Sequence, residues 1–319
     1  MQVRHLHKFS CEKSKSCRKI IEHCYRPEVC YKDITKRHLR SLCHVDLYVF
    51  GFPCQNFSNL GRGQGTLVEN GQLIMYSLAY IEAHKPTAII IENVSTIPTK
   101  HRELLDFIDT TLSSCGYTFQ WKILNALDFG VPQSRSRWYG VAILQTAKRT
   151  GDESFFPEAL EYQIPLSAII QPLPEGMWQM LPTDEDTLEY ANVVAAYRKH
   201  AACGVNPFES PIIIDVGSSP GFSTSRVDAS PCLTRSRCGS FGYWCSTKGG
   251  LLDVREMALL QGFNESEVDW RGARVSEGQF AAAIGNGMCA TVLQYLIPRV
   301  LYMAKLATSE EVAQMLSNI

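Results

Sequence analysis

The stretch DLYVFGFPCQNFSNLGRGQG, from Asp46 to Gly65, passes from an apolar run into a proline, a cysteine and a loop rich in glycine and polar residues. The first part is aromatic and β-branched, which is typical of a buried strand. The second part is typical of a loop that can close over a ligand. A single thiol, Cys54, therefore lies where a strand opens into a loop.

Two more runs of the same kind follow, TAIIIENV and SRWYGVAIL, and each ends at a polar or glycine break. Helix-like segments such as GQLIMYSLAYIEAHKP separate the runs. The alternation up to about residue 145 predicts an α/β fold with a parallel sheet. Sites in such sheets form at the carboxyl ends of the strands.

The pattern changes after this first part. Residues 146–250 begin with a proline-rich and acidic segment and continue with a glycine- and arginine-rich segment. Regular patterning returns at LLDVREMALLQGF. We therefore expect a main domain made of residues 1–145 and 251–319, including the C-terminal helices, with a smaller irregular region at 146–250 between them.

Composition bounds the function only loosely. The 319 residues are 45% hydrophobic and carry a net charge of −1, so the chain can bury a full core but has no global basic field. No signal peptide and no run of 18 apolar residues is visible, which predicts a protein inside the cell. The 12 cysteines form no CxxC pair, which favours reduced thiols and no bound metal.

Three segments bring chemistry together: Pro53-Cys54-Gln55, Glu92-Asn93-Val94, and GVPQSRSRW before the third apolar run. If their strand ends share one edge of the sheet, a thiol, a carboxyl group and two arginines converge there. Each alone is typical of a core cysteine, a capping glutamate or a solvated surface. Together they suit addition of a thiolate to C6 of a cytosine ring.

Thiolate addition at C6, with protonation of N3, turns C5 of the ring into a nucleophile that can attack an electrophilic methyl group. A glutamate in a partly apolar cleft has a raised pKa and can carry the proton for N3. Arginines can orient the ring oxygen and the flanking phosphates. Loss of the C5 proton then expels the cysteine.

The blocks GFPCQNFS, IIIENV, NALDFGVPQSRSRWYGVAI, REMALLQGF and AIGNGM, in this order, resemble those of the C5-cytosine DNA methyltransferase family. The resemblance covers nearly the whole chain except residues 146–225. It implies a Rossmann-like class I methyltransferase sheet with a small irregular target-recognition region at 146–250. It also implies transfer of a methyl group from S-adenosylmethionine to a cytosine flipped out of double-stranded DNA.

The resemblance also implies roles for individual residues. Cys54 would be the nucleophile, Glu92 the acid at N3, and Arg135 and Arg137 the arginines that hold the base, while Phe52 would offer its backbone carbonyl. Further substrate contacts are expected at Gln55, Ser58 and Gln133. Asn93 is expected to hold the cysteine loop.

In the target-recognition region, SRVDASPCLTRSRCGSFGYW concentrates positive charge and aromatic side chains. We expect Thr234 to bond a phosphate. The cations expected to face DNA are Arg226, Arg235, Arg237 and Lys248. The aromatic side chains that could stack at the emptied site are Phe241, Tyr243 and Trp244.

For the cofactor, the resemblance places Glu12 at the ribose hydroxyls, Asp33 at the adenine amine and Ile34 against the adenine ring. Further cofactor contacts are expected at Pro53, Leu73 and Asn286. The family begins with a strand and an F-x-G-x-G turn, and nothing before HKFSCEKS supplies them. We therefore expect the central first strand to be missing, with IIIDVGSSPG as an alternative, displaced turn.

Two alternatives to an active DNA enzyme stay open. One is a catalytically silent DNA-binding homologue or truncated fragment, and the other is a related RNA cytosine methyltransferase. We expect the protein to act on double-stranded DNA as a monomer. For a DNA enzyme the location would be with the DNA, in the nucleus of a eukaryote or the cytoplasm of a bacterial host.

Overall fold

The computed structural model describes residues 5–52, 73–151 and 154–317. It divides into two compact units. The first comprises Met1–Leu124, Ser136–Glu158 and Leu293–Ile319, and the second comprises Asn125–Arg135 and Ala159–Val292. These units follow contacts in space and cross the sequence boundaries expected near residues 145 and 250, which remain a prediction.

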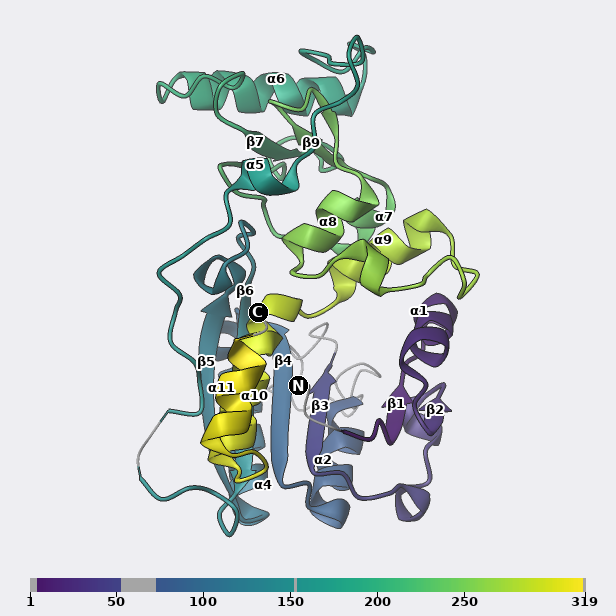
Figure 1. The fold of residues 1–319 in the computed structure, drawn as a ribbon, viewed down its shortest axis with the longest axis vertical. Coiled ribbons are helices and arrows are strands. Elements are labelled where there is room, and N and C mark those ends of the chain that lie inside the picture. Colours follow the sequence, from purple (N-terminus) through teal and green to yellow (C-terminus); the bar gives the residue numbers. More distant parts are fainter. Residues whose placement is uncertain (1–4, 53–72, 152–153, 318–319) are drawn as a thin grey trace. The chain divides into compact units, whose positions relative to one another are not determined.

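The main sheet of the first unit has the strand order β3-β4-β6-β5 (Figure 1). The three apolar runs form β3 (Leu47–Gly51), β4 (Ala88–Val94) and β6 (Ser136–Leu144), as the sequence predicted. The edge strand β5 spans Tyr117–Asn125. Strands β3 and β4 are parallel and are separated in sequence by the helix α2, Leu73–His84.

The expectation of a wholly parallel sheet is wrong for β6, which pairs antiparallel with β4. The chain reaches β6 from the neighbouring β5 through residues 126–135, without a crossover helix. A parallel connection needs a crossover of a dozen or more residues, usually helical. The start of β6 consequently lies beside the end of β4, with Arg137 opposite Val94.

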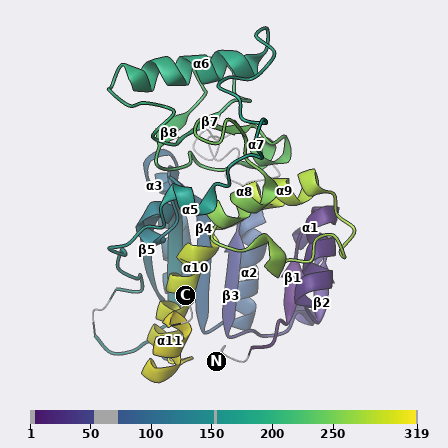
Figure 2. The same cartoon turned by 45° about the horizontal axis from the view of Figure 1, so that its top comes forward.

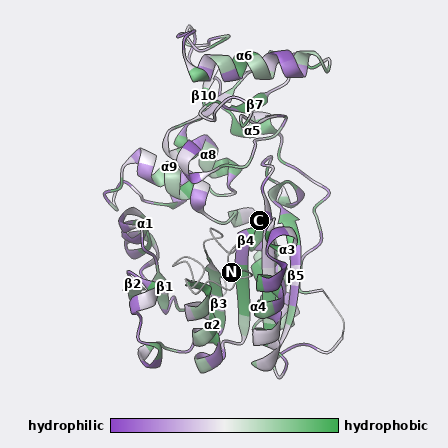
Figure 3. Cartoon of the chain, turned by 180° about the vertical axis from the view of Figure 1, so that it is seen from behind, coloured by the Kyte–Doolittle hydropathy of each residue, from purple (hydrophilic) through white to green (hydrophobic). Residues whose placement is uncertain are grey.

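Helices cover both faces of this sheet (Figures 1 and 3). On one face lie α2, α3 (Ile97–Lys100) and α4 (Arg102–Ser114), and on the other lie the C-terminal part of α10 (Ala290–Met303) and α11 (Ser309–Leu316). Residues 88–91 of β4 are therefore completely buried. An uninterrupted apolar run, rather than an alternating one, is what a strand covered on both sides requires.

A second, two-stranded parallel sheet pairs β1 (Phe9–Cys11) with β2 (Val29–Tyr31). Between these strands the chain forms α1 (Lys15–Ile20) and a π-helical turn (Ile21–Tyr25). Among the described strands, none links this pair to β3 by hydrogen bonds. Ring contacts join them instead, because the Phe9 ring lies 6.1 Å from that of Tyr48 and 5.5 Å from that of Tyr80.

The second unit contains a sheet of order β10-β9-β7-β8, of which Figure 2 labels β7 and β8 beside the helix α6. Its strands are β7 (Ile212–Asp215), β8 (Ser225–Val227), β9 (Tyr243–Cys245) and β10 (Gly250–Leu251), and all the neighbours pair antiparallel. The helix α6 (Leu188–Ala201) packs on this sheet. Val193 of α6 shares a buried apolar cluster with Ile214 and Trp244.

Shorter helices complete the second unit: α5 (Leu166–Ile169), α7 (Arg235–Gly239), α8 (Val254–Leu260) and α9 (Glu277–Asn286). Capping boxes begin α8, α9 and α11, each pairing an Asp, Ser or Thr with a Glu or Gln three residues later. In the described chain no single helix is long and apolar enough to cross a membrane. The helices α9 and α10 pass that test only as a pair bent by 47°.

Gly262 offers a test of this packing. Its φ of +91° is left-handed, and a Cβ there would lie 1.9 Å from Oγ1 of Thr291 and 2.7 Å from its backbone nitrogen. We expect Gly262→Ala to lower the free energy of unfolding by about 2–4 kcal/mol, from backbone strain plus overpacking. Urea denaturation measures it. The control Gly116→Ala has a similar φ of +86° but open space, and should cost only about 1 kcal/mol. An equal loss of unfolding free energy in both variants would show that the close approach of Thr291 to Gly262 does not contribute.

Candidate active site

Glu92 and Arg137 form the centre of the site in the first unit. Nε of Arg137 lies 3.2 Å from a carboxylate oxygen of Glu92, and both side chains are mostly buried. Glu92 on β4 lies opposite Tyr139 on β6, and Arg137 is two residues before Tyr139 on that strand. This diagonal spacing is within reach of long side chains. The sheet register therefore brings together two of the four residues expected to be catalytic.

Asn93 fixes the point at which the chain leaves β3. Its Nδ2 donates a hydrogen bond to the backbone carbonyl of Phe52 at 2.8 Å, and the side chain is buried. This agrees with the expectation that Asn93 holds the start of the cysteine loop. The expected site residues Pro53, Cys54, Gln55 and Ser58 lie outside the described residues.

In the second unit, Gln133 and Arg135 lie inside a buried hydrogen-bonded cluster. Nε2 of Gln133 donates to the carbonyl of Leu260 at 2.8 Å and to Oε1 of Gln261 at 2.7 Å. Arg135 donates to the carbonyls of Leu233 at 2.6 Å and Gly287 at 2.7 Å. The cluster thus ties together segments near residues 133, 233, 261 and 287.

Gln133 was expected to contact the substrate directly, but its side chain is enclosed in this cluster. Gln133 is fully buried, and its carbonyl oxygen also accepts the backbone N–H of Leu233 at 3.1 Å. Arg135 is 3% exposed, and its Nη atoms already donate to backbone carbonyls. Both side chains support the loop that precedes β6. Of the two arginines in SRSR, Arg137 is the one beside Glu92.

The four cations expected to face DNA separate into two groups. Lys248 is buried, and its Nζ lies 2.6 Å from Glu256, which is completely buried. Nε of Arg237 lies 3.2 Å from Oδ1 of Asp215. Arg226 and Arg235 are exposed. The prediction for Lys248 is therefore wrong, because a buried lysine paired with a buried carboxylate cannot reach a phosphate.

The contacts of Asp215 bear on the alternative that IIIDVGSSPG is a displaced cofactor-binding turn. Its carboxylate accepts the hydroxyl of Ser218 at 2.6 Å and the N–H of Gly217 at 3.1 Å, besides the ion pair with Arg237. The carboxylate is engaged inside the second unit. This segment is a turn between β7 and β8 whose carboxylate holds the turn and Arg237 together, which does not favour a displaced cofactor site.

The aromatic side chains of GSFGYW are mostly core residues. Tyr243 and Trp244 are 1% and 3% exposed. The hydroxyl of Tyr243 accepts from the N–H of Thr234 at 3.0 Å, and the indole of Trp244 donates to the hydroxyl of Tyr197 at 3.2 Å. Stacking by these two rings is therefore a wrong prediction. Phe222, which the sequence pattern did not single out, is 79% exposed on the turn before β8 and is one of several exposed aromatic residues between 146 and 250.

Thr234 and Arg235 are exposed at the start of α7. They line an open pocket of about 700 Å³ whose other side is formed by the start of α9. The remaining lining residues are Ser236, Gly239, Ser276, Gly278, Gln279 and Ala282. These two expected phosphate contacts are thus accessible.

The residues expected at the nucleoside of the cofactor follow the two strands of the small sheet. Glu12 comes directly after β1, and Asp33 comes two residues after β2. The parallel pairing puts both carboxylates at one edge of the pair. Two hydrogen bonds from Thr35 hold the Asp33 carboxylate and lower its pKa. Acceptors of this kind fit the hydroxyls and the amine of an adenosine.

Two further expected cofactor contacts lie in different units. Leu73 is the first residue of α2 in the first unit, whereas Asn286 is the exposed last residue of α9 in the second. Ile34 is half-buried in the turn after Asp33. Among the described residues, no group of His, Cys, Asp and Glu side chains is arranged to hold a metal ion.

Comparison with known proteins gives the family. A family model described as C-5 cytosine-specific DNA methylase matches residues 2–205. The type II methyltransferase M.DsaV of Dactylococcopsis salina is 29% identical over 297 residues, covering 92% of this chain and 79% of the relative. M.NgoBI of Neisseria gonorrhoeae is 31% identical over 292 residues, covering 90% and 83%. The chain belongs to the C-5 cytosine-specific DNA methylase family.

A solved structure confirms the fold. The Dnmt2 methyltransferase of S. pombe superposes with a TM-score of 0.64 at 19% identity, covering 93% of this chain and 91% of that one. The expected Rossmann-like methyltransferase class is therefore confirmed. Family membership makes the chain an S-adenosylmethionine-dependent cytosine-5 methyltransferase.

The different environments of Arg235 and Arg237 generate a matched pair of variants. Arg235→Ala removes an exposed cation, so the dependence of log Kobs for duplex DNA on log salt should flatten by about 0.9. Arg237→Ala instead removes the cation paired with Asp215, and should lower the free energy of unfolding by about 1 kcal/mol. Fluorescence anisotropy and urea denaturation measure the two effects. A reversed assignment, with stability lost in Arg235→Ala only, would show that this reading of α7 is wrong.

Proposed function

We propose that this chain methylates C5 of cytosine in double-stranded DNA, with Cys54 as the nucleophile and the target base flipped out of the helix. The observation that carries the proposal is the pairing of Glu92 with Arg137 at the end of β4, beside the anchored carbonyl of Phe52. Cys54 follows Phe52 by two residues. Phe52 is in turn bonded to Asn93, the residue that follows the expected acid Glu92.

Each residue has a defined task in this reaction. The Cys54 thiolate adds to C6 while Glu92 gives a proton to N3, so the electron pair of the ring double bond moves to C5. When bound, the cofactor would supply the electrophilic methyl group from its sulfonium to C5 and leave as a neutral thioether. Water then takes the C5 proton, the electron pair restores the ring double bond, the N3 proton returns to Glu92 and the thiolate leaves C6.

Arg137 positions the acid in this scheme. In the structure its guanidinium is the partner of the Glu92 carboxylate. We propose that the base displaces this contact, so that the guanidinium turns to the ring oxygen, while Glu92, protonated from water once its cation has left, turns to N3. Arg135 is a positioning residue, because its Nη donors tie the loop before β6 to the carbonyls of Leu233 and Gly287.

The thiol can be tested by covalent trapping. Duplex DNA carrying 5-fluorocytosine should form a denaturation-resistant adduct with this chain in the presence of S-adenosylmethionine, because fluorine cannot leave as the C5 proton does. Cys54→Ser should form none. The matched control Cys43→Ser changes an exposed thiol of the same unit and should trap like the unmodified chain. Equal adduct from Cys54→Ser would exclude this nucleophile.

The acid can be tested by charge removal. Glu92→Gln keeps the shape of the side chain but has no acidic proton to give, so methyl transfer should fall by about 10²- to 10⁴-fold. The assay is tritium transfer from labelled S-adenosylmethionine to duplex DNA and, in parallel, to RNA of the same sequence. Glu103→Gln, on the exposed side of α4, is the control. Transfer to RNA alone would contradict the DNA assignment, and full activity of Glu92→Gln would contradict the role of the acid.

A further inference from the structure

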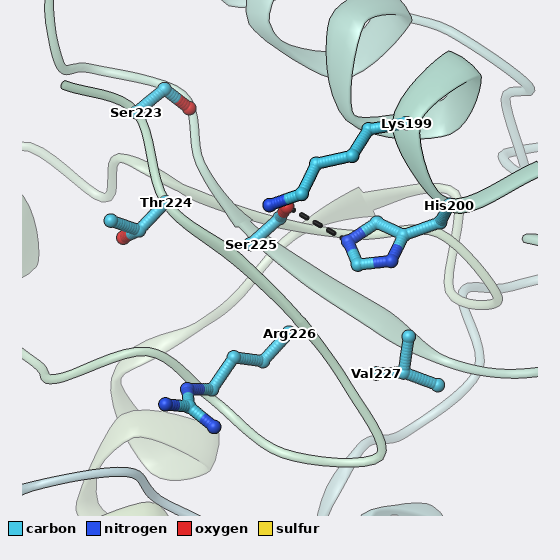
Figure 4. A pocket seen from close by; sticks show the side chains of 7 residues that line it. All are labelled: Lys199, His200, Ser223, Thr224, Ser225, Arg226 and Val227. Atoms are coloured by element: carbon cyan, nitrogen blue, oxygen red, sulfur yellow. Dashed lines mark hydrogen bonds between the residues drawn. The ribbon is translucent and has the colours of Figure 1, made fainter. Parts of the chain in front are cut away.

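An open pocket of about 440 Å³ lies in the second unit, between the end of α6 and the edge strand β8. Its lining consists of Lys199 and His200 from the helix and residues 223–227 from the turn and the strand (Figure 4). Two of these seven residues are permanent cations and three carry hydroxyl groups. None is acidic.

The two cations of this pocket, Lys199 and Arg226, differ from the paired cations of the same unit. Both are exposed, and within the described residues neither forms an ion pair, whereas Arg237 and Lys248 each contact a carboxylate. Figure 4 shows Lys199 reaching beside Ser225 and the guanidinium of Arg226 extending away on the other side. The pocket is thus flanked by positive charge from both sides.

The end of α6 does not neutralise Lys199. The last carbonyls of the helix already accept from the following turn: Arg198 from the N–H of Ala202, and His200 from the N–H groups of Cys203 and Val205. These bonds satisfy the partial negative charge that a helix end otherwise presents. The ammonium group is consequently available to an anion from outside.

The backbone of β8 adds donors at the same place. Thr224 accepts from the N–H of Asp215, and Asp228 donates to the carbonyl of Pro211, so these two residues point toward β7. Because successive residues of a strand alternate, the N–H groups of Ser225 and Val227 point toward the outer edge. Among the described strands, β8 has no neighbour on that side.

His200 contributes hydrogen bonding rather than charge. Its Nε2 lies 2.9 Å from the hydroxyl of Ser225. Burial lowers its pKa, and the nearby Lys199 charge lowers it further. The neutral ring therefore dominates at neutral pH, and the positive charge of the pocket comes from Lys199 and Arg226.

We propose that this pocket binds a backbone phosphate of duplex DNA, held by Lys199, Arg226 and the edge N–H groups of β8. A phosphodiester presents acceptor oxygens and one negative charge, which matches a pocket of cations and donors without carboxylates. Phe222, 79% exposed on the turn before β8, offers an apolar face for an adjoining sugar or base. DNA as the partner rests on the proposed function, whereas the phosphate chemistry does not.

One other role would explain the same cations. Charged side chains on an edge strand prevent it from pairing with a strand of another molecule. In that case Lys199 and Arg226 would keep the chain monomeric and would not touch DNA. The two roles predict different results when the charges are removed.

The experiment uses the whole chain and a fluorescein-labelled 20-base-pair duplex, with binding followed by anisotropy at several salt concentrations. Lys199→Gln and Arg226→Gln should each reduce the slope of log Kobs against log salt by about 0.9, and the double variant by about twice that. Lys199→Arg and Arg226→Lys keep the charge and should keep the slope. Thermal melting confirms that each variant is folded.

Arg198→Gln is the matched control, because Arg198 is exposed in the same helical turn but does not line the pocket. An equal slope change in Arg198→Gln would overturn phosphate binding in this pocket, because any surface cation of the helix would then have the same electrostatic effect. Unchanged slopes with new self-association in light scattering would overturn it in favour of edge protection. Slope changes with duplex RNA of the same sequence but not with DNA would overturn DNA as the partner.

This readout is independent of chemistry. Reduced slopes together with absent trapping at Cys54 would support the pocket while rejecting the proposed function. Normal trapping at Cys54 together with unchanged slopes would support the proposed function and reject phosphate binding in the pocket.

Discussion

The antiparallel pairing of β4 with β6 is the constraint on which the candidate active site depends. It sets the beginning of one strand beside the end of the other, so Arg137 and Glu92 meet at 3.2 Å although they are far apart in sequence. If the pair were parallel, the beginning of β6 would lie beside the beginning of β4, and Arg137 would be far from Glu92. Residues 88–91 of β4 are completely buried, so this strand is held by packing on both faces of the sheet.

The hydrogen-bonded cluster around Gln133, Arg135 and Gln261 has a comparable function in the second unit. Four segments that are distant in the chain exchange hydrogen bonds there, and most of the partners are backbone carbonyls. Buried amide and guanidinium groups are costly unless their donors are satisfied. The blocks near residues 133, 261 and 287 are therefore each other's hydrogen-bond partners.

Burial also decides which cations of the second unit can act on a ligand. Lys248 and Arg237 stabilise carboxylates inside the unit, while Lys199, Arg226 and Arg235 remain at the surface. Nothing in the local sequence separates Arg235 from Arg237, which are two residues apart in the same short helix. The helical turn directs one to Asp215 and the other outward, and this difference depends on where β7 ends.

The sequence by itself determined the α/β class, the three strands β3, β4 and β6, and the family, because apolar runs and ordered blocks are local patterns. It also determined Glu92 as a candidate acid and Asn93 as the anchor of the cysteine loop. Only the tertiary structure decided that β6 is antiparallel, that Gln133, Tyr243, Trp244 and Lys248 are buried, and that Lys199 and Arg226 line one pocket of the second unit. Burial and register arise from contacts between distant segments, and no local pattern of residues records which segments will meet.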